Sequence, residues 1–254
     1  MGAKENPSTE IPRGTLGTVR NAVLLLDLLS QGQPFQQLTD LAERSGLSLP
    51  TVHRLLRSLA VAGLVEQDPE SSRYGLGPEL VRLSERYLDR LPVVHAIAPY
   101  LVEIRNGTKA TVLAAVLTRG WTVYVDRVDG EDAGGVFREP VRMRPAFETA
   151  AGRLLAARSG TDAWKEALAT ANGQSFTQEE SKRWAKAPYL VLVDEERHGS
   201  AEIAVPVIGR SGQTLASLAA TGSPELYSEE VLVDRVAPQL QRAAAAVSRA
   251  LSHG

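Results

Sequence analysis

Apolar side chains near the start of the chain recur every three or four residues. This spacing predicts an amphipathic helix over residues 17–31. A shorter helix over 38–45 should end at Gly46, and a third over 49–63 should begin after Ser48, its expected N-cap. The apolar stripe of the third helix is formed by Val52, Leu55, Leu56 and Leu59.

Two short strand-like segments follow these three helices. Residues 64–67 and 73–76 flank a turn-rich stretch over 68–72, a pattern typical of a β-hairpin. Helix, short helix, turn, helix and hairpin is the order of a winged helix-turn-helix. Residues 78–90 then predict a further helix, which we interpret as a connector.

After Pro92 the pattern alternates between helical and strand-like segments. We therefore predict an α+β protein, in which a winged helix-turn-helix is joined by a helix to a domain built on an antiparallel sheet. The expected organisation is a flexible tail over 1–14, a DNA-binding domain over 15–77, a connector helix over 78–91 and a second domain over 92–254. Strands are expected at 110–117, 121–128, 140–143, 189–194, 201–209 and 214–221, and a final amphipathic helix at about 229–251.

The third helix is the candidate for reading DNA. In a helix-turn-helix the second helix of the motif enters the major groove, where arginine can read guanine or hold a phosphate. If the apolar stripe faces the core, the opposite edge faces outward, and Arg73 beside the hairpin turn is placed to contact the DNA backbone. The DNA-binding candidates are Ser48, Pro50, Thr51, His53, Arg54, Arg57 and Arg73.

The charge balance of the chain predicts that several such domains bind DNA together. The chain carries a formal net charge of -2, and acidic residues slightly outnumber basic ones over residues 1–75. Attraction to phosphates is therefore weak for one domain, so we expect affinity to require two or more. The same balance keeps open an alternative, in which the winged helix contacts a protein and the chain is a ligand-binding or interaction module.

The amino-acid composition excludes several kinds of site and indicates where the protein is found. The chain has no cysteine, which excludes disulfides, thiolate zinc sites and cysteine nucleophiles and fits a cytoplasmic protein. No apolar stretch approaches the length of a membrane-spanning helix, and the polar first residues do not resemble a signal peptide. We expect no membrane partner.

Several segments resemble the IclR family of transcription regulators. Residues 47–56, 63–69 and 73–77 are similar to its helix-turn-helix and wing. In the second domain the similarity is carried by Arg144-Pro145, Thr149-Ala150, Gly152, Leu154-Leu155, Ala204, Pro206-Val207 and Thr221-Gly222. The resemblance implies a regulator of double-stranded operator DNA, a repressor rather than an activator, that forms a homodimer or homotetramer. It also implies a GAF-like second domain that binds a small-molecule effector.

Carried over by position, the family's pocket includes Ala150, Ala151, Asp194, Glu202, Ala219 and Thr221. This chain departs from the family pattern because Glu202 replaces a usual cysteine, Ala219 and Thr221 replace a serine pair, and Phe147 replaces a histidine. A carboxylate would repel an anionic effector unless Arg144 or Arg153 neutralised it, so an amine-bearing or hydroxylated ligand is favoured.

Each pocket candidate has a structural alternative. Glu202 could be a surface residue or an ion-paired strand residue, and the alanines and Thr221 could simply pack in a helix or strand. Asp194 begins an acidic run, which is usually a solvated loop. His198 near that run could suggest a metal site, but a loop charge cluster explains the pattern.

No phosphate-binding, dinucleotide-binding, hydrolase or metalloprotease motif occurs. We therefore expect no enzyme activity, no catalytic residue, no metal and no cofactor. An enzyme in the second domain remains a third hypothesis.

Overall fold

The computed structural model describes residues 17–131, 143–194 and 199–253. The chain divides between Tyr87 and Leu88 into two compact units, each with its own hydrophobic core. Among the described residues, no helix combines the length and apolar composition needed to cross a bilayer.

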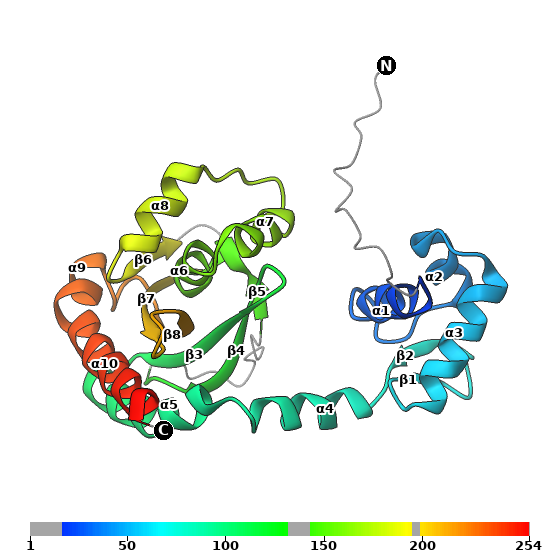
Figure 1. Ribbon diagram of the computed structural model, residues 1–254, viewed down its shortest axis with the longest axis horizontal. Coiled ribbons are helices and arrows are strands. Elements are labelled where there is room, and N and C mark those ends of the chain that lie inside the picture. The colour runs from blue at the N-terminus through cyan, green and yellow to red at the C-terminus, as the bar shows by residue number, and fades with distance from the viewer. Residues whose placement is uncertain (1–16, 132–142, 195–198, 254) are drawn as a thin grey trace, which may run out of the picture. The chain divides into compact units, whose positions relative to one another are not determined.

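The N-terminal unit is a winged helix-turn-helix, as the hydrophobic pattern predicts. Its elements are α1 (Gly17–Leu29), α2 (Leu38–Ser45), α3 (Leu49–Val61) and the hairpin strands β1 (Val65–Gln67) and β2 (Tyr74–Leu76), followed by α4 (Glu79–Leu88) (Figure 1). Gly46 ends α2 in the left-handed conformation, with φ of 67°, which favours glycine. The core consists of Leu25, Leu29, Leu41, Val52, Leu55, Leu56, Leu59, Val65 and Tyr74.

The C-terminal unit is built on a six-stranded antiparallel sheet with strand order β5-β4-β3-β8-β7-β6. The strands are β3 (Thr111–Thr118), β4 (Trp121–Val128), β5 (Met143–Pro145), β6 (Leu190–Asp194), β7 (Ser200–Ile208) and β8 (Thr214–Gly222). A strand was expected at 140–143. The described strand is Met143–Pro145, and residues 140–142 lie outside the described residues.

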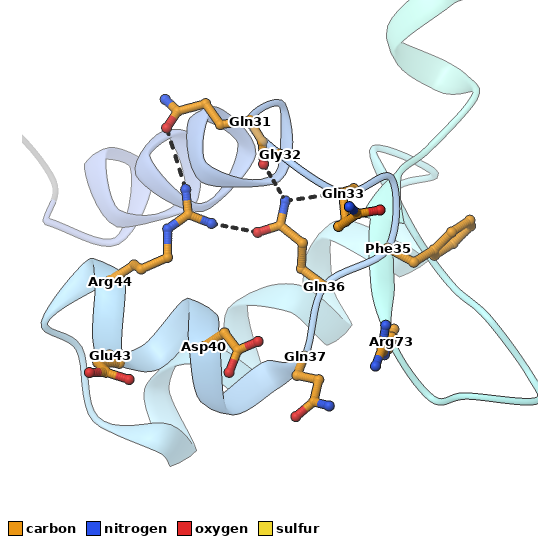
Figure 2. A pocket seen from close by; sticks show the side chains of 10 residues that line it. All are labelled: Gln31, Gly32, Gln33, Phe35, Gln36, Gln37, Asp40, Glu43, Arg44 and Arg73. Carbon is orange, nitrogen blue, oxygen red and sulfur yellow. Dashed lines mark hydrogen bonds between the residues drawn. The ribbon is translucent and has the colours of Figure 1, made fainter.

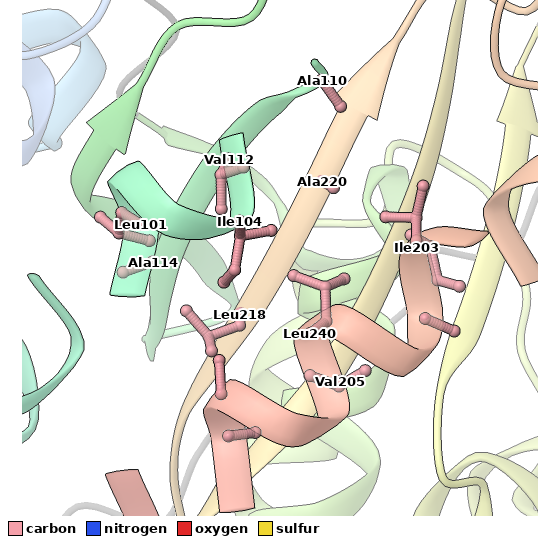
Figure 3. Close-up of a cluster of buried hydrophobic side chains, with 14 of the residues drawn as sticks. Leu101, Ile104, Ala110, Val112, Ala114, Ile203, Val205, Leu218, Ala220 and Leu240 are labelled. Carbon is pink, nitrogen blue, oxygen red and sulfur yellow. The ribbon is translucent and has the colours of Figure 1, made fainter. Parts of the chain in front are cut away.

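Side chains along each strand alternate between the two faces of this sheet. Val112, Ala114, Leu218 and Ile203 face α5 (Pro92–Thr108) and α10 (Ala237–His253), where they form the largest core cluster (Figure 3). Leu113, Ala115, Ala204 and Ala219 belong to a second cluster that packs on α6 (Ala150–Arg158). The sheet is therefore covered by helices on both faces.

Three elements complete this unit. A single 3-10 turn (Ala146–Glu148) precedes α6, and α7 (Thr161–Ala169) and α8 (Gln178–Lys186) follow it. The final helix covers residues 229–253, as expected, but it is not α-helical throughout. It begins as α9 (Glu229–Val231), passes through a π-helical segment (Leu232–Val236) and continues as α10. The π segment shifts the helix register and buries both Leu232 and Val236 against the sheet.

Candidate DNA-binding surface and effector-binding region

One edge of α3 is free of core contacts. His53, Arg54 and Arg57 are exposed, whereas the apolar stripe of the same helix is buried. The helical period separates the two sets because residues three and four apart share a face. Pro50 stands in the first turn, where no intrahelical donor is lost, and is also exposed.

The start of α3 differs in detail from the expectation. Ser48 occupies the N-cap position but its side chain caps no backbone amide. Its hydroxyl instead lies 2.8 Å from the Thr51 hydroxyl. Thr51 is half-buried rather than fully exposed. The two hydroxyls therefore form a polar pair at the N-terminal end of the helix.

Arg73 lies at the end of the hairpin turn, directly before β2. Arg73 is exposed, and its carbonyl accepts a 2.8 Å hydrogen bond from the Asp68 amide, which closes the turn. The Ser71 side chain and backbone donate to the Asp68 carboxylate and hold its pKa below the usual value. The turn therefore keeps its shape without using the Arg73 guanidinium.

Gln36 is a structural residue of this unit that the sequence pattern did not single out. Its side-chain amide nitrogen lies 2.8–3.3 Å from the carbonyl oxygens of Leu28, Leu29, Gln31 and Gln33 near the end of α1, which share its two hydrogens. Its backbone exchanges two 2.9 Å hydrogen bonds with Tyr74 of β2. Gln36 thus ties the end of α1 to the wing. No periodic signal distinguishes it from the neighbouring glutamines.

A shallow cavity opens next to Gln36. It is lined by both basic and acidic side chains, among them Arg44, Arg73, Asp40 and Glu43 (Figure 2). Because acidic and basic side chains both line it, the cavity has no preference for a phosphate group. We therefore do not count it as part of the candidate DNA-binding surface on α3.

In the C-terminal unit the start of α6 is held by threonines. The Thr149 hydroxyl caps the helix by accepting a 2.9 Å hydrogen bond from the Gly152 amide, and it lies 2.9 Å from the Thr122 hydroxyl of β4. A Cβ at Gly152 would lie 2.1 Å from the Thr122 Oγ1 and 2.2 Å from the Ala146 carbonyl oxygen. Only glycine allows the helix to approach the strand this closely.

Glu202 projects from β7 toward the same helix start. Its carboxylate accepts a 3.1 Å hydrogen bond from the Ala151 amide, and the side chain is buried. Burial raises the pKa of Glu202, while the Ala151 and Ala150 amides, then Arg144 and Arg153, oppose that rise. The surface position that the sequence allowed is therefore wrong for Glu202.

The other expected pocket residues differ in their burial and in their position relative to the Glu202–Ala151 hydrogen bond. Thr221 pairs directly with Glu202 across β7 and β8, so both side chains share the α6 face. Arg144 is half-buried on β5. Ala150, Ala151 and Ala219 are fully buried in the cluster between α6 and the sheet, as the packing alternative requires. Asp194 ends β6 beside Ser200, and its side chain lies outside the described residues.

Two family models cover most of the chain. The IclR helix-turn-helix domain matches residues 18–69, and the bacterial transcriptional regulator IclR C-terminal domain matches residues 85–249. The chain belongs to the IclR family of transcription regulators. It is therefore a DNA-binding regulator whose C-terminal domain responds to a small-molecule effector.

Individual IclR relatives agree over nearly the full length. A glycerol operon regulatory protein of Streptomyces coelicolor is 31% identical, with 93% of this chain and 97% of the relative covered. The IclR regulator structure from Brucella abortus has a TM-score of 0.79 at 22% identity, covering 97% of this chain and 96% of that one. An IclR homologue of Microbacterium hydrocarbonoxydans, solved with 4-hydroxybenzoate, has a TM-score of 0.68 at 19% identity, covering 93% and 100%. These last two likenesses concern the fold.

An aromatic cluster adjoins α6 in this IclR chain. Phe147 and Trp164 pack with ring centroids 4.8 Å apart, and Phe176 and Trp184 join them. The Arg153 guanidinium lies 5.5 Å and 5.4 Å from the centroids of Phe176 and Trp184. Because Arg153 also donates to the Phe147 carbonyl at 2.8 Å, it connects α6 to the cluster.

Within the described residues, no group of three histidine, cysteine or acidic side chains is placed to hold a metal ion. His198 and the acidic residues Glu195 and Glu196 lie outside the described residues, so the structure does not describe the alternative metal site raised from the sequence.

Proposed function

We propose that the exposed edge of α3 reads operator DNA and that Arg73 of the wing contacts the DNA backbone. The observation that carries this proposal is the separation on α3 between exposed His53, Arg54 and Arg57 and the buried apolar stripe. The guanidinium groups are directed into solvent, where they can reach base edges and phosphates. The N-terminus of α3, which approaches the groove, carries Ser48, Pro50 and Thr51.

The functional form is at least a homodimer, with a homotetramer as its larger assembly. Apolar side chains are exposed on α1 and on one face of α4, while the charged residues of α4 lie on its other face. A second copy of the chain would cover these side chains and bring two recognition helices together, as the weak charge of one domain requires. The exposed apolar residues are Val19, Val23, Val81, Leu83 and Tyr87.

The effector binds on the α6 face of the C-terminal sheet. The support is the convergence of Arg144, Glu202 and Thr221 near the start of α6, with Ala150, Ala151 and Ala219 leaving room as small side chains. Asp194 at the end of β6 belongs to the same proposed region. The working domains are 15–77 for DNA, 78–91 as connector and 92–254 for effector.

Effector binding changes the balance between two arrangements of the paired DNA-binding domains through α4. The protein works in the cytoplasm, where its DNA is, and represses transcription by covering a promoter.

The experiment is a fluorescence anisotropy titration of the full chain with its own upstream DNA and with a scrambled duplex. The titration is repeated at several salt concentrations. We expect tighter binding to the upstream DNA by at least about a thousandfold, and a loss of affinity with rising salt. Affinity that never depends on sequence would favour the alternative, an interaction module whose winged helix contacts protein.

A further inference from the structure

The start of α6 already holds a carboxylate from within the chain. A helix N-terminus binds anions because its first amides lack intrahelical acceptors and its dipole is positive there. Here the Ala151 amide donates to Glu202 at 3.1 Å and the Gly152 amide donates to the Thr149 hydroxyl at 2.9 Å. The anion position at this helix is therefore filled by a side chain of β7.

Neighbouring groups offset part of the cost of burying this carboxylate. Arg144 of β5 and Arg153 of α6 both stabilise its ionised form. A second carboxylate brought to the buried Glu202 would add a negative charge without a new partner, and burying an unpaired charge is costly. An ammonium group would compete with the two arginines. The electrostatics at this point favour an uncharged ligand.

The side chains around Glu202 suit hydroxyl groups. Thr221 is its direct neighbour on the sheet, and the phenol of Tyr124 lies close enough that Glu202 and Thr149 influence its ionisation. Burial, reinforced by Glu202, raises the pKa of Tyr124. Its hydroxyl is protonated at neutral pH, as for any tyrosine, and can donate. A ligand hydroxyl can donate to the Glu202 carboxylate and accept from the neighbouring hydroxyl groups.

We infer that the Glu202 carboxyl group occupies and thereby closes the α6 N-terminus to carboxylic acids, and that it selects an uncharged, hydroxyl-bearing effector. This inference rests on the proposed effector site on the α6 face. It assigns to Glu202 a role in specificity, because the carboxylate occupies the place that an acidic ligand would take.

The test compares the full-length protein with Glu202→Ser, which opens the helix start, and Glu202→Gln, which fills it without charge. The matched control is Glu225→Ser, an exposed glutamate of the same unit. Probes are alcohol and acid pairs of equal skeleton: glycerol and glycerate, xylitol and xylonate, and 4-hydroxybenzyl alcohol and 4-hydroxybenzoate. Binding is measured by calorimetry without DNA, so the result does not depend on whether an operator is bound.

We expect the wild type and Glu225→Ser to bind none of the acids more tightly than the paired alcohol. Glu202→Ser should bind at least one acid about tenfold more tightly than the wild type does, and Glu202→Gln should gain less because the amide still fills the site. Circular dichroism confirms that each variant is folded, and if Glu202→Ser does not fold, the comparison with Glu202→Gln decides. Acid preference in the wild type, or no gain of acid binding in the folded variants, would overturn the inference.

Discussion

Arg44 donates a 2.6 Å hydrogen bond from Nη1 to the Oε1 of Gln36. The arginine belongs to α2, whereas Gln36 lies in the segment between α1 and α2 (Figure 2). Arg44 fixes the oxygen of the amide, so the nitrogen is directed at the carbonyls near the end of α1. One side-chain amide therefore connects two helices, and its backbone connects them to the wing.

This arrangement predicts that Gln36→Ala destabilises the DNA-binding unit by about 1–3 kcal/mol, because it leaves buried carbonyls without a donor. Urea unfolding followed by circular dichroism measures the change. Gln37→Ala is the matched control, since Gln37 is exposed, and it should change stability by less than about 0.5 kcal/mol. Equal effects of the two variants would contradict the role of Gln36.

Arg54→Ala should weaken operator binding by about 1–3 kcal/mol if the guanidinium makes a bidentate contact with a base. The loss should depend on the base pair that the arginine reads, which a set of single-base operator variants measures by anisotropy. Arg242→Ala removes the same charge from the exposed surface of α10 and should leave affinity unchanged. Full affinity in Arg54→Ala would show that α3 is not the reading element.

The pKa of Glu202 predicts a pH dependence of stability. The folded protein raises this pKa through burial, so it binds the proton more tightly than the unfolded chain does. The free energy of unfolding from this group therefore falls as the pH rises from about 4 through the raised pKa, and it is constant above that range.

Glu202→Gln cannot titrate and should lose this component. Urea unfolding across that pH range measures the free energy of unfolding of both proteins. As the pH rises, the wild type should lose stability relative to the variant. The other groups near Glu202, namely Tyr124, Arg144 and Arg153, are the same in both proteins. A difference that does not change with pH would mean that the pKa of Glu202 is not raised.

Gly152→Ala should destabilise the C-terminal unit by about 1–3 kcal/mol, because the added Cβ would collide with Thr122 and the Ala146 carbonyl. Thermal unfolding of the full chain measures this. Gly173→Ala provides a comparison at a position with open space, where only the positive φ of 82° adds strain. Less damage at Gly152 than at Gly173 would contradict the close approach of α6 to β4.

Val81→Asp should weaken the dimer because it places a charge on the apolar face of α4. Analytical ultracentrifugation over a range of concentrations should show more monomer than in the wild type. Arg86→Asp changes a residue on the charged side of the same helix and should leave the assembly intact. A dimer unaffected by Val81→Asp would place the interface elsewhere.

The sequence predicted the elements whose signals are local. The stripe on α3, the glycine that ends α2 and the alternation of the sheet strands each follow from neighbouring residues, and the structure contains all of them. Ser48 takes the expected N-cap position, but its hydroxyl pairs with the Thr51 hydroxyl and makes no capping bond. The final helix lies where it was expected, and its π-helical segment was not predicted.

The site was harder to predict because its contacts join distant residues. Glu202 and Ala151 are 51 positions apart, and Thr122 and Thr149 are 27 apart. Nothing in the spacing of β7 distinguishes a glutamate that faces solvent from one that faces α6. The family resemblance indicated the position of Glu202, but only the packing of α6 on the sheet showed what its carboxylate contacts.

The position of Arg153 gives this protein an intrinsic optical signal. Its guanidinium lies over Trp184, and its backbone belongs to the helix whose first residues meet Glu202. A ligand that moves this helix relative to α8 would change the distance between the cation and the indole, to which tryptophan emission is sensitive. Fluorescence of the unlabelled chain therefore offers a readout for binding at the proposed effector site.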